Sequence, residues 1–112
     1  MNWLQQHGAQ CALASIVVAE RFRGAFAVPF ERRAESLKAA HKLVQENAER
    51  IIPFDAKAAE AWGEYVERPA LKAHPKSYPD TQIAAIALSH DLIVVTRNVE
   101  DFPEVPTLNP FV

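Results

Sequence analysis

The stretch from Pro79 to Phe102 constrains the fold of this chain more than any other. Asp80 opens a segment whose apolar side chains recur at helical spacing, which predicts a helix that ends near His90. Residues 92–95, Leu-Ile-Val-Val, are apolar without alternation, as expected of a strand that is covered on both faces. A helix, a tight turn and a strand in this order bring the start of the helix and the end of the strand to one edge of a sheet, where α/β proteins build their sites.

The rest of the chain alternates short apolar runs with helical periodicity. We expect a strand over Gln10–Ala14, a helix over Ile16–Ala27 that Ser15 caps, a helix from Phe30 to about Arg50, a strand at Ile51–Ile52 and a helix that Asp55 caps. Arg68–Pro79 holds three prolines and is predicted to be a loop, and Val105–Leu108 is a candidate edge strand. Strands that alternate with helices imply an α/β fold with a mostly parallel sheet.

Composition narrows the classes of function. The net charge of −2 gives no global basic surface, so a nucleic-acid partner would need a local patch or a contact through a metal. The single cysteine, Cys11, excludes an internal disulfide and fits a reducing compartment. No signal peptide and no membrane-spanning apolar run are evident, so the predicted location is cytoplasmic. Only three glycines are present, which argues against a nucleotide-binding glycine loop.

Three carboxylates are candidates for chemistry: Glu20, Asp80 and Asp101. Glu20 lies one turn into the helix that follows the first strand, so all three can meet at the carboxyl edge of the sheet, beside Asn98. Carboxylates ~4 Å apart repel by roughly 4 kcal/mol per pair at an effective dielectric near 20. A hard cation would neutralise this repulsion, and oxygen-only ligands point to Mg²⁺ or Mn²⁺. Such a site suits phosphodiester hydrolysis.

Simpler roles are open for the same residues. Capping preferences favour an N-cap over a ligand for Asp80 by roughly 3 to 1. Asn98 with Asp101 three residues later resembles a capping pair, at about even odds. Glu20 could form a surface pair with Arg23. An α/β structural domain whose carboxylates are all caps is therefore one of the alternatives.

The same stretch carries a resemblance to a known family. The string D-x-x-I-A-A-x-A-L-x-x-x-L-x-V-V-T-R-N-x-x-D-F, from Asp80 to Phe102, closely resembles the C-terminal half of PIN-domain ribonucleases of the VapC/FitB toxin type. Ser15–Glu20 resembles the S-x-x-x-x-E of the family, and Leu108–Phe111 resembles its usual tail. The resemblance covers essentially the whole chain and implies a PIN-like α/β fold, in which a short, mostly parallel sheet is flanked by helices.

The resemblance also implies a function. Glu20 matches the second acidic position of the family, Asp80 the third, and Asn98 with Asp101 the closing part of the motif. It implies a metal-dependent endoribonuclease toxin in which Glu20, Asp80 and Asp101 bind Mg²⁺ or Mn²⁺, while Asn98 completes the shell or holds a water at the ion. The implied partners are an RNA substrate and a small antitoxin protein.

One part of the family pattern has no counterpart. The family begins with a central strand that ends in Asp, typically L-D-T-N, and nothing upstream of Trp3 supplies it. Met1–His7 is expected to be a helix fragment, so residues 1–112 are expected to form a single PIN-like domain without the first strand and most of the first helix. The alternative function is a catalytically inactive remnant that binds an antitoxin or a second copy. Unpaired sheet edges predict a homodimer or higher oligomer. Asp91 replaces the usual Gly, which predicts a left-handed backbone there.

Overall fold

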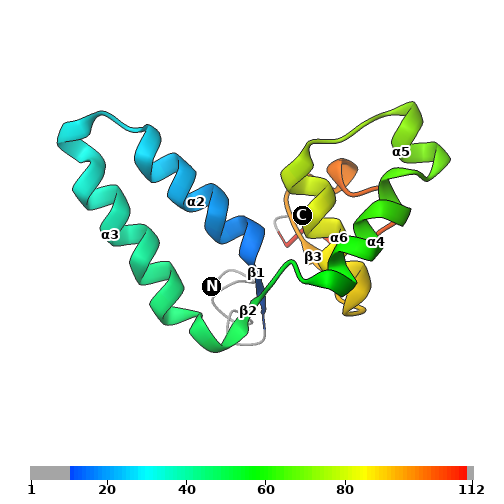
Figure 1. Cartoon of the computed structure of the whole chain (residues 1–112), viewed down its shortest axis with the longest axis horizontal. Helices are drawn as coiled ribbons and strands as arrows, with labels where there is room; N and C mark the ends of the chain where they lie inside the picture. Colours follow the sequence, from blue (N-terminus) through cyan, green and yellow to red (C-terminus); the bar gives the residue numbers. More distant parts are fainter. Residues whose placement is uncertain (1–10, 111–112) are drawn as a thin grey trace. The chain divides into compact units, whose positions relative to one another are not determined.

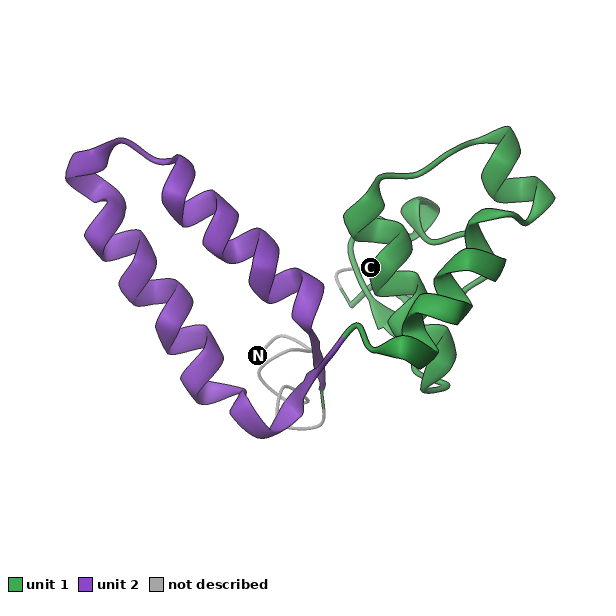
Figure 2. Ribbon diagram, viewed as in Figure 1, with its two compact units in different colours: residues 1–11, 54–112 green, residues 12–53 purple. Residues whose placement is uncertain are grey.

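The computed structural model describes residues 11–110, which form two compact units (Figures 1 and 2). We call residues 12–53 the hairpin unit and residues 54–110 the C-terminal unit. The predictions for Met1–His7, for the start of the strand at Gln10 and for the tail residue Phe111 lie outside the described residues. Within the described residues, no helix is long and apolar enough to cross a membrane.

Two antiparallel helices and a pair of short parallel strands make up the hairpin unit (Figure 1). Its elements are β1 (Leu13–Ala14), α2 (Ser15–Ala27), α3 (Phe30–Glu46), the 3₁₀ helix η2 (Ala48–Arg50) and β2 (Ile51–Ile52). Leu13 pairs with Ile51 and Ala14 with Ile52. The two helices form the crossover connection that parallel strands need. Pro53, which has no N–H donor, follows the end of the predicted strand β2.

Two boundaries in this unit differ from the predictions. Ser15 is the first helical residue of α2, and the cap position is Ala14, so Ser15 is not the N-cap. The long helix ends at Glu46 instead of near Arg50. The Asn47 side chain donates to the carbonyl oxygen of Leu43 at 2.8 Å, and its backbone N–H donates to the carbonyl oxygen of Val44. These bonds tighten the last turn, and the chain continues as the 3₁₀ helix η2.

Helices α4 and α6 pack against each other and on two short parallel strands in the C-terminal unit. Its elements are α4 (Ala56–Val66), α5 (Pro69–Ala73), α6 (Tyr78–Ser89), β3 (Val94–Val95), the 3₁₀ helix η3 (Val99–Asp101) and β4 (Thr107–Leu108). Val94 pairs with Thr107 and Val95 with Leu108. The core contains Tyr65, Leu71, Ala84, Ala87, Val94, Phe102 and Val105. Buried alanines on both helices allow their backbones to approach closely.

Local signals predicted several of these elements. Asp55 caps α4, since its Oδ1 accepts from the Ala58 N–H at 3.0 Å. Asp91, which follows α6, has a φ of 53°, and this confirms the predicted left-handed turn. Helices that flank short parallel strands also confirm the predicted α/β fold class of the PIN-like type.

Two predictions for this unit are wrong. The proline-rich segment Arg68–Pro79 contains α5, because Pro69 stands at the first helical position, where its fixed φ is compatible with a helix and its missing N–H costs nothing. Leu71 then anchors this short helix in the core. The run 92–95 forms a strand only at Val94–Val95, and Ile93 is 61% exposed. Leu92 is 37% exposed as well, so the run is not covered on both faces.

Candidate functional site

Asp80 lies half-buried at the N-terminal end of α6, as its third residue. The cap of this helix is Ser77, whose Oγ accepts from the Asp80 N–H at 3.3 Å, while Tyr78 and Pro79 occupy the first two positions. The N-cap interpretation of Asp80 is therefore wrong. Its carboxylate stands where the free N–H groups and the dipole of the helix favour a negative charge.

Asn98 and Asp101 follow the carboxyl end of β3. The Asn98 N–H donates to Thr96 Oγ1 at 3.1 Å, and the Asp101 N–H donates to the Asn98 carbonyl oxygen at 3.0 Å. These two bonds fix the turn into η3. Asn98 occupies the cap position of η3 but makes no side-chain capping bond among the described residues. The side-chain capping pair is therefore not formed, and Asn98 is exposed while Asp101 is half-buried.

Tyr65 on α4 connects the start of α6 with the segment that follows η3. The buried phenol donates to the Pro103 carbonyl oxygen at 2.7 Å. Burial raises the pKa of Tyr65 to about 12. The Arg68 guanidinium opposes this shift in pKa, whereas the carboxylates of Glu104 and Asp80 add to it.

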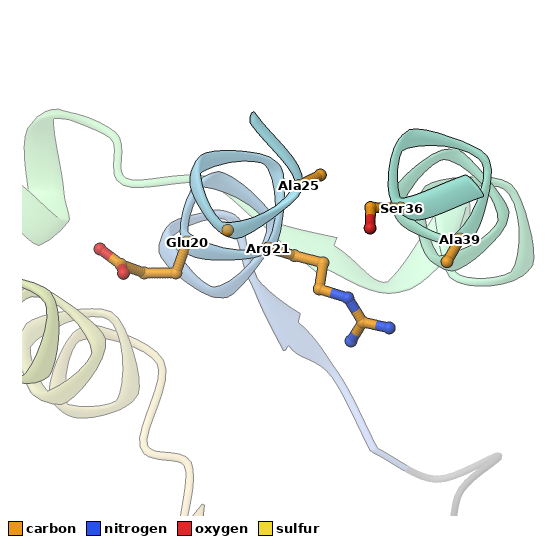
Figure 3. A pocket seen from close by; sticks show the side chains of 6 residues that line it. Glu20, Arg21, Ala25, Ser36 and Ala39 are labelled. Atoms are coloured by element: carbon orange, nitrogen blue, oxygen red, sulfur yellow. The ribbon is translucent and has the colours of Figure 1, made fainter. Parts of the chain in front are cut away.

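Glu20 belongs to the hairpin unit, where it is exposed on α2. Its Oε2 lies 3.8 Å from Arg23 Nη1, so the surface pair that was the simpler prediction is present. Figure 3 shows Glu20 and Arg21 pointing to opposite sides of α2, with Arg21 directed toward α3. A hollow of about 280 Å³ lies between the two helices, lined by Glu20, Arg21, Gly24, Ala25, Ser36 and Ala39. An exposed ion pair at this distance contributes little and does not commit the Glu20 carboxylate to Arg23.

Three residues of the C-terminal unit offer hard oxygen donors. Asp80, Asn98 and Asp101 offer two carboxylates and an amide oxygen, which fit Mg²⁺ or Mn²⁺ by their chemistry. Mg²⁺ is commonly held by one or two carboxylates, with waters and a substrate phosphate completing its shell. Within residues 11–110, no group of three or more His, Cys, Asp or Glu side chains is arranged to hold a metal ion. Metal binding by Glu20, Asp80 and Asp101 therefore stays a prediction.

Sequence reasoning missed two residues that shape this region. Ser77 stands three residues before Asp80, the spacing of a capping box, and this signal could have found it. Tyr65 stands three residues after Trp62 on the same helical face, but no local pattern indicates its bond to Pro103.

Helices packed on short parallel strands, with an acidic residue heading a helix and Asn and Asp following a strand, define this chain as an α/β protein of the PIN-like class. Residues 2–108 match the PIN domain, and the chain belongs to this family. It is a PIN domain of the VapC/FitB type, as the motif residues predicted.

Solved structures support this assignment. The crystal structure of FitAcB from Neisseria gonorrhoeae is 30% identical with a TM-score of 0.72, and the match covers 89% of this chain and 75% of that chain. VapBC2 from Rickettsia felis, bound to a DNA fragment from its promoter, is 25% identical in sequence with a TM-score of 0.72. This match covers 88% of this chain and 73% of that chain. DNA-bound VapBC from Salmonella typhimurium shows the same fold, with 23% sequence identity and a TM-score of 0.81. This match covers 94% of this chain and 79% of that chain. Curated proteins include no significant match.

Proposed function

We propose that this chain is the toxin of a toxin–antitoxin pair and acts as a metal-dependent endoribonuclease. PIN domains are generally nucleases, and Glu20, Asp80 and Asp101 match acidic positions of the family that follow its first Asp. The observation that carries the proposal is the position of Asp80 at the start of α6, with its carboxylate not used as the helix cap. Asn98 and Asp101 follow β3 in the same unit and supply further oxygen donors.

The proposed roles follow from the donor chemistry of these side chains. Asp80 and Asp101 would hold Mg²⁺ or Mn²⁺ together with Glu20, and the Asn98 amide oxygen would complete the shell or accept a hydrogen bond from a water. The phosphate of the RNA would enter as a further ligand. When bound, such an ion polarises the phosphate and lowers the pKa of a water at the site. Since the family match spans both units, we propose that residues 1–112 form one PIN domain.

The partners are also part of this proposal. The resemblance to VapC/FitB toxins implies a small antitoxin protein, and the matching structures are FitAcB and VapBC assemblies. Exposed apolar side chains, among them Phe26, Phe30 and Ile93, support contacts with an antitoxin or with a second copy of the chain. The cytoplasmic location stays a prediction from the sequence.

RNA cleavage tests the catalytic part of the proposal. The chain, free of antitoxin, should cleave RNA with Mn²⁺ or Mg²⁺ and should stop when EDTA removes the ion. Asp80→Ala should abolish cleavage while the circular-dichroism spectrum stays that of the folded protein. Asp55→Ala is a matched control, because it removes a carboxylate that only caps α4. Full activity of Asp80→Ala would contradict the assignment.

One observation favours a second function, a non-catalytic binding module. Large apolar side chains such as Phe26, Phe30 and Ile93 are exposed, and such residues suit contacts with another protein chain. Under this alternative the folded chain would bind an antitoxin or itself and would neither cleave RNA nor bind Mn²⁺. Light scattering, combined with the cleavage assay above, separates the two functions.

A further inference from the structure

Two aromatic rings from different helices stack at the start of α6. The ring centroids of Trp62 on α4 and Tyr78 on α6 are 5.9 Å apart, with an interplanar angle of 24°. Trp62 is half-buried, whereas Tyr78 is 71% exposed. One face of the Tyr78 ring therefore rests on Trp62, and the rest of the ring is open to solvent. We call this pair the aromatic platform.

Hydrogen bonds hold the platform in place. Trp62 Nε1 donates to Thr81 Oγ1 at 3.0 Å, and the same hydroxyl donates to the Tyr78 carbonyl oxygen at 3.0 Å. Thr81 is only 4% exposed, so this chain of bonds is shielded from water. The indole is thus fixed by its polar end, and the first residue of α6 is fixed by its carbonyl group. A ring that is held and exposed can bind a flat ligand without a large loss of side-chain entropy.

The platform and the proposed metal carboxylate share the first turn of α6. Tyr78 is two residues before Asp80 in the first turn of α6, and Ser77 caps that turn. On α4, Trp62 donates its indole N–H to Thr81, the residue that directly follows Asp80. The stacked rings and the carboxylate therefore occupy the same end of the C-terminal unit. Lys76, two residues before Tyr78, adds a positive charge to this part of the chain.

We propose that the aromatic platform stacks an unpaired base of single-stranded RNA, from a nucleotide close to the one whose phosphate reaches Asp80. This inference rests on the proposed function and adds a base-binding position next to its site. Unpaired bases present a π-face of the size of a tyrosine ring, and proteins that bind single strands stack bases on such rings. A duplex offers no free face, because its bases already stack on one another.

RNA affinity in the presence of EDTA tests the platform without cleavage and without the metal. The full chain is titrated into a labelled, short single-stranded RNA of mixed sequence, and the fluorescence anisotropy gives Kd. Tyr78→Ala should weaken binding roughly tenfold, the scale of one stacked base. Tyr78→Phe keeps the ring and should stay within about twofold of the unaltered protein, since every base stacks on a phenyl ring as well. The same RNA annealed to its complement should bind all three proteins equally.

Several results would overturn this inference. These are an unchanged Kd for Tyr78→Ala, an equal loss of affinity for single-stranded and duplex RNA, and no binding of single-stranded RNA by the unaltered protein. An equal loss on both RNAs would mean that the ring contacts the backbone. The proposed function fails separately, when Asp80→Ala cleaves RNA normally while Tyr78→Ala still loses affinity for the single strand.

Discussion

The Tyr65 phenol donates a 2.7 Å hydrogen bond to the carbonyl oxygen of Pro103, 38 residues further along the chain. This bond ties α4 to the segment that follows η3, which carries Asp101. Arg68 reinforces the connection, since its Nη1 lies 3.4 Å from Glu104 Oε1. The backbone of Glu104 has a φ of 61°, a left-handed conformation that turns the chain toward β4. Tyr65 on α4 and Arg68 at the cap position of α5 thus hold the turn that follows Asp101.

Tyr65→Phe should destabilise the chain, because the Pro103 carbonyl group loses its partner while the ring packing is retained. We expect a loss of about 1–2 kcal/mol in the free energy of unfolding, measured by urea denaturation. Tyr78→Phe is the control, since it removes a hydroxyl from an exposed ring and should change stability by less than about 0.5 kcal/mol. Equal effects of the two substitutions would contradict this account of the bond.

The free energy of unfolding should fall at high pH, because the phenol of Tyr65 loses its proton. Burial raises the pKa of Tyr65 from 10.0 to about 12, so the folded chain holds the proton more tightly than the unfolded chain does. The protonated phenol contributes fully to the free energy of unfolding below pH 10. This contribution is lost as the pH rises toward 12, and the loss amounts to about 2–3 kcal/mol in total. Urea unfolding at increasing pH should show the loss in the unaltered protein. Tyr65→Phe should show a flatter dependence, and parallel curves for the two proteins would exclude this cause.

Ser77→Ala should destabilise the start of α6 by about 1 kcal/mol, because the Asp80 N–H loses the side chain that caps it. The same substitution should weaken the proposed site, since Asp80 stands in the frayed turn. Ser77→Gly serves as the comparison, because glycine replaces a capping residue at a cost of only a few tenths of a kcal/mol. Urea unfolding gives the stabilities, and an alanine variant as stable as the glycine variant would argue against the cap.

Neighbouring carboxylates of η3 should differ in metal binding. Asp101→Asn should weaken Mn²⁺ binding and reduce RNA cleavage roughly 100-fold or more, because charge stabilisation of several kcal/mol is lost. Glu100→Gln removes the adjacent, exposed carboxylate and should leave both unchanged. Isothermal titration with Mn²⁺ and the cleavage assay measure the two effects. Identical behaviour of the pair would remove Asp101 from the proposed ligand set.

Self-association should depend on the exposed residue next to β3. Ile93 is a β-branched side chain that is 61% exposed beside a short strand, and such an edge favours pairing between chains. Ile93→Lys should lower the molar mass measured by light scattering, because a charge at a strand edge opposes pairing. Val99→Lys places the same charge on η3 and is the control. A monodisperse monomer of the unaltered chain would contradict this prediction.

Short-range signals accounted for much of the fold. Asp55 was predicted to cap α4 and does so, β2 ends before Pro53, and Asp91 turns the chain in a left-handed conformation. Each of these outcomes depends on the residue and its immediate neighbours. The same holds for the family motif from Asp80 to Phe102, whose order of residues was enough to predict the PIN-like fold.

The errors share a different cause. The prolines of Arg68–Pro79 predict a loop, but Leu71 is buried in the core and stabilises the short helix α5. The apolar run 92–95 is predicted to be covered on both faces, yet Ile93 lies before β3 and is exposed, because no other part of the described chain covers it. In both cases the outcome depends on which distant surfaces are available for burial, and local composition does not contain that information.

Some features of the candidate site likewise follow from the sequence, and others depend on the tertiary structure. The sequence alone determined the residue types, their order and their family positions, because a carboxylate at a helix start and polar residues after a strand are local features. Only the tertiary structure decided that Tyr65 binds Pro103 and that Trp62 stacks on Tyr78. These two contacts join segments 38 and 16 residues apart, and they form because α4 packs against distant parts of the chain, which depends on the burial of the core as a whole.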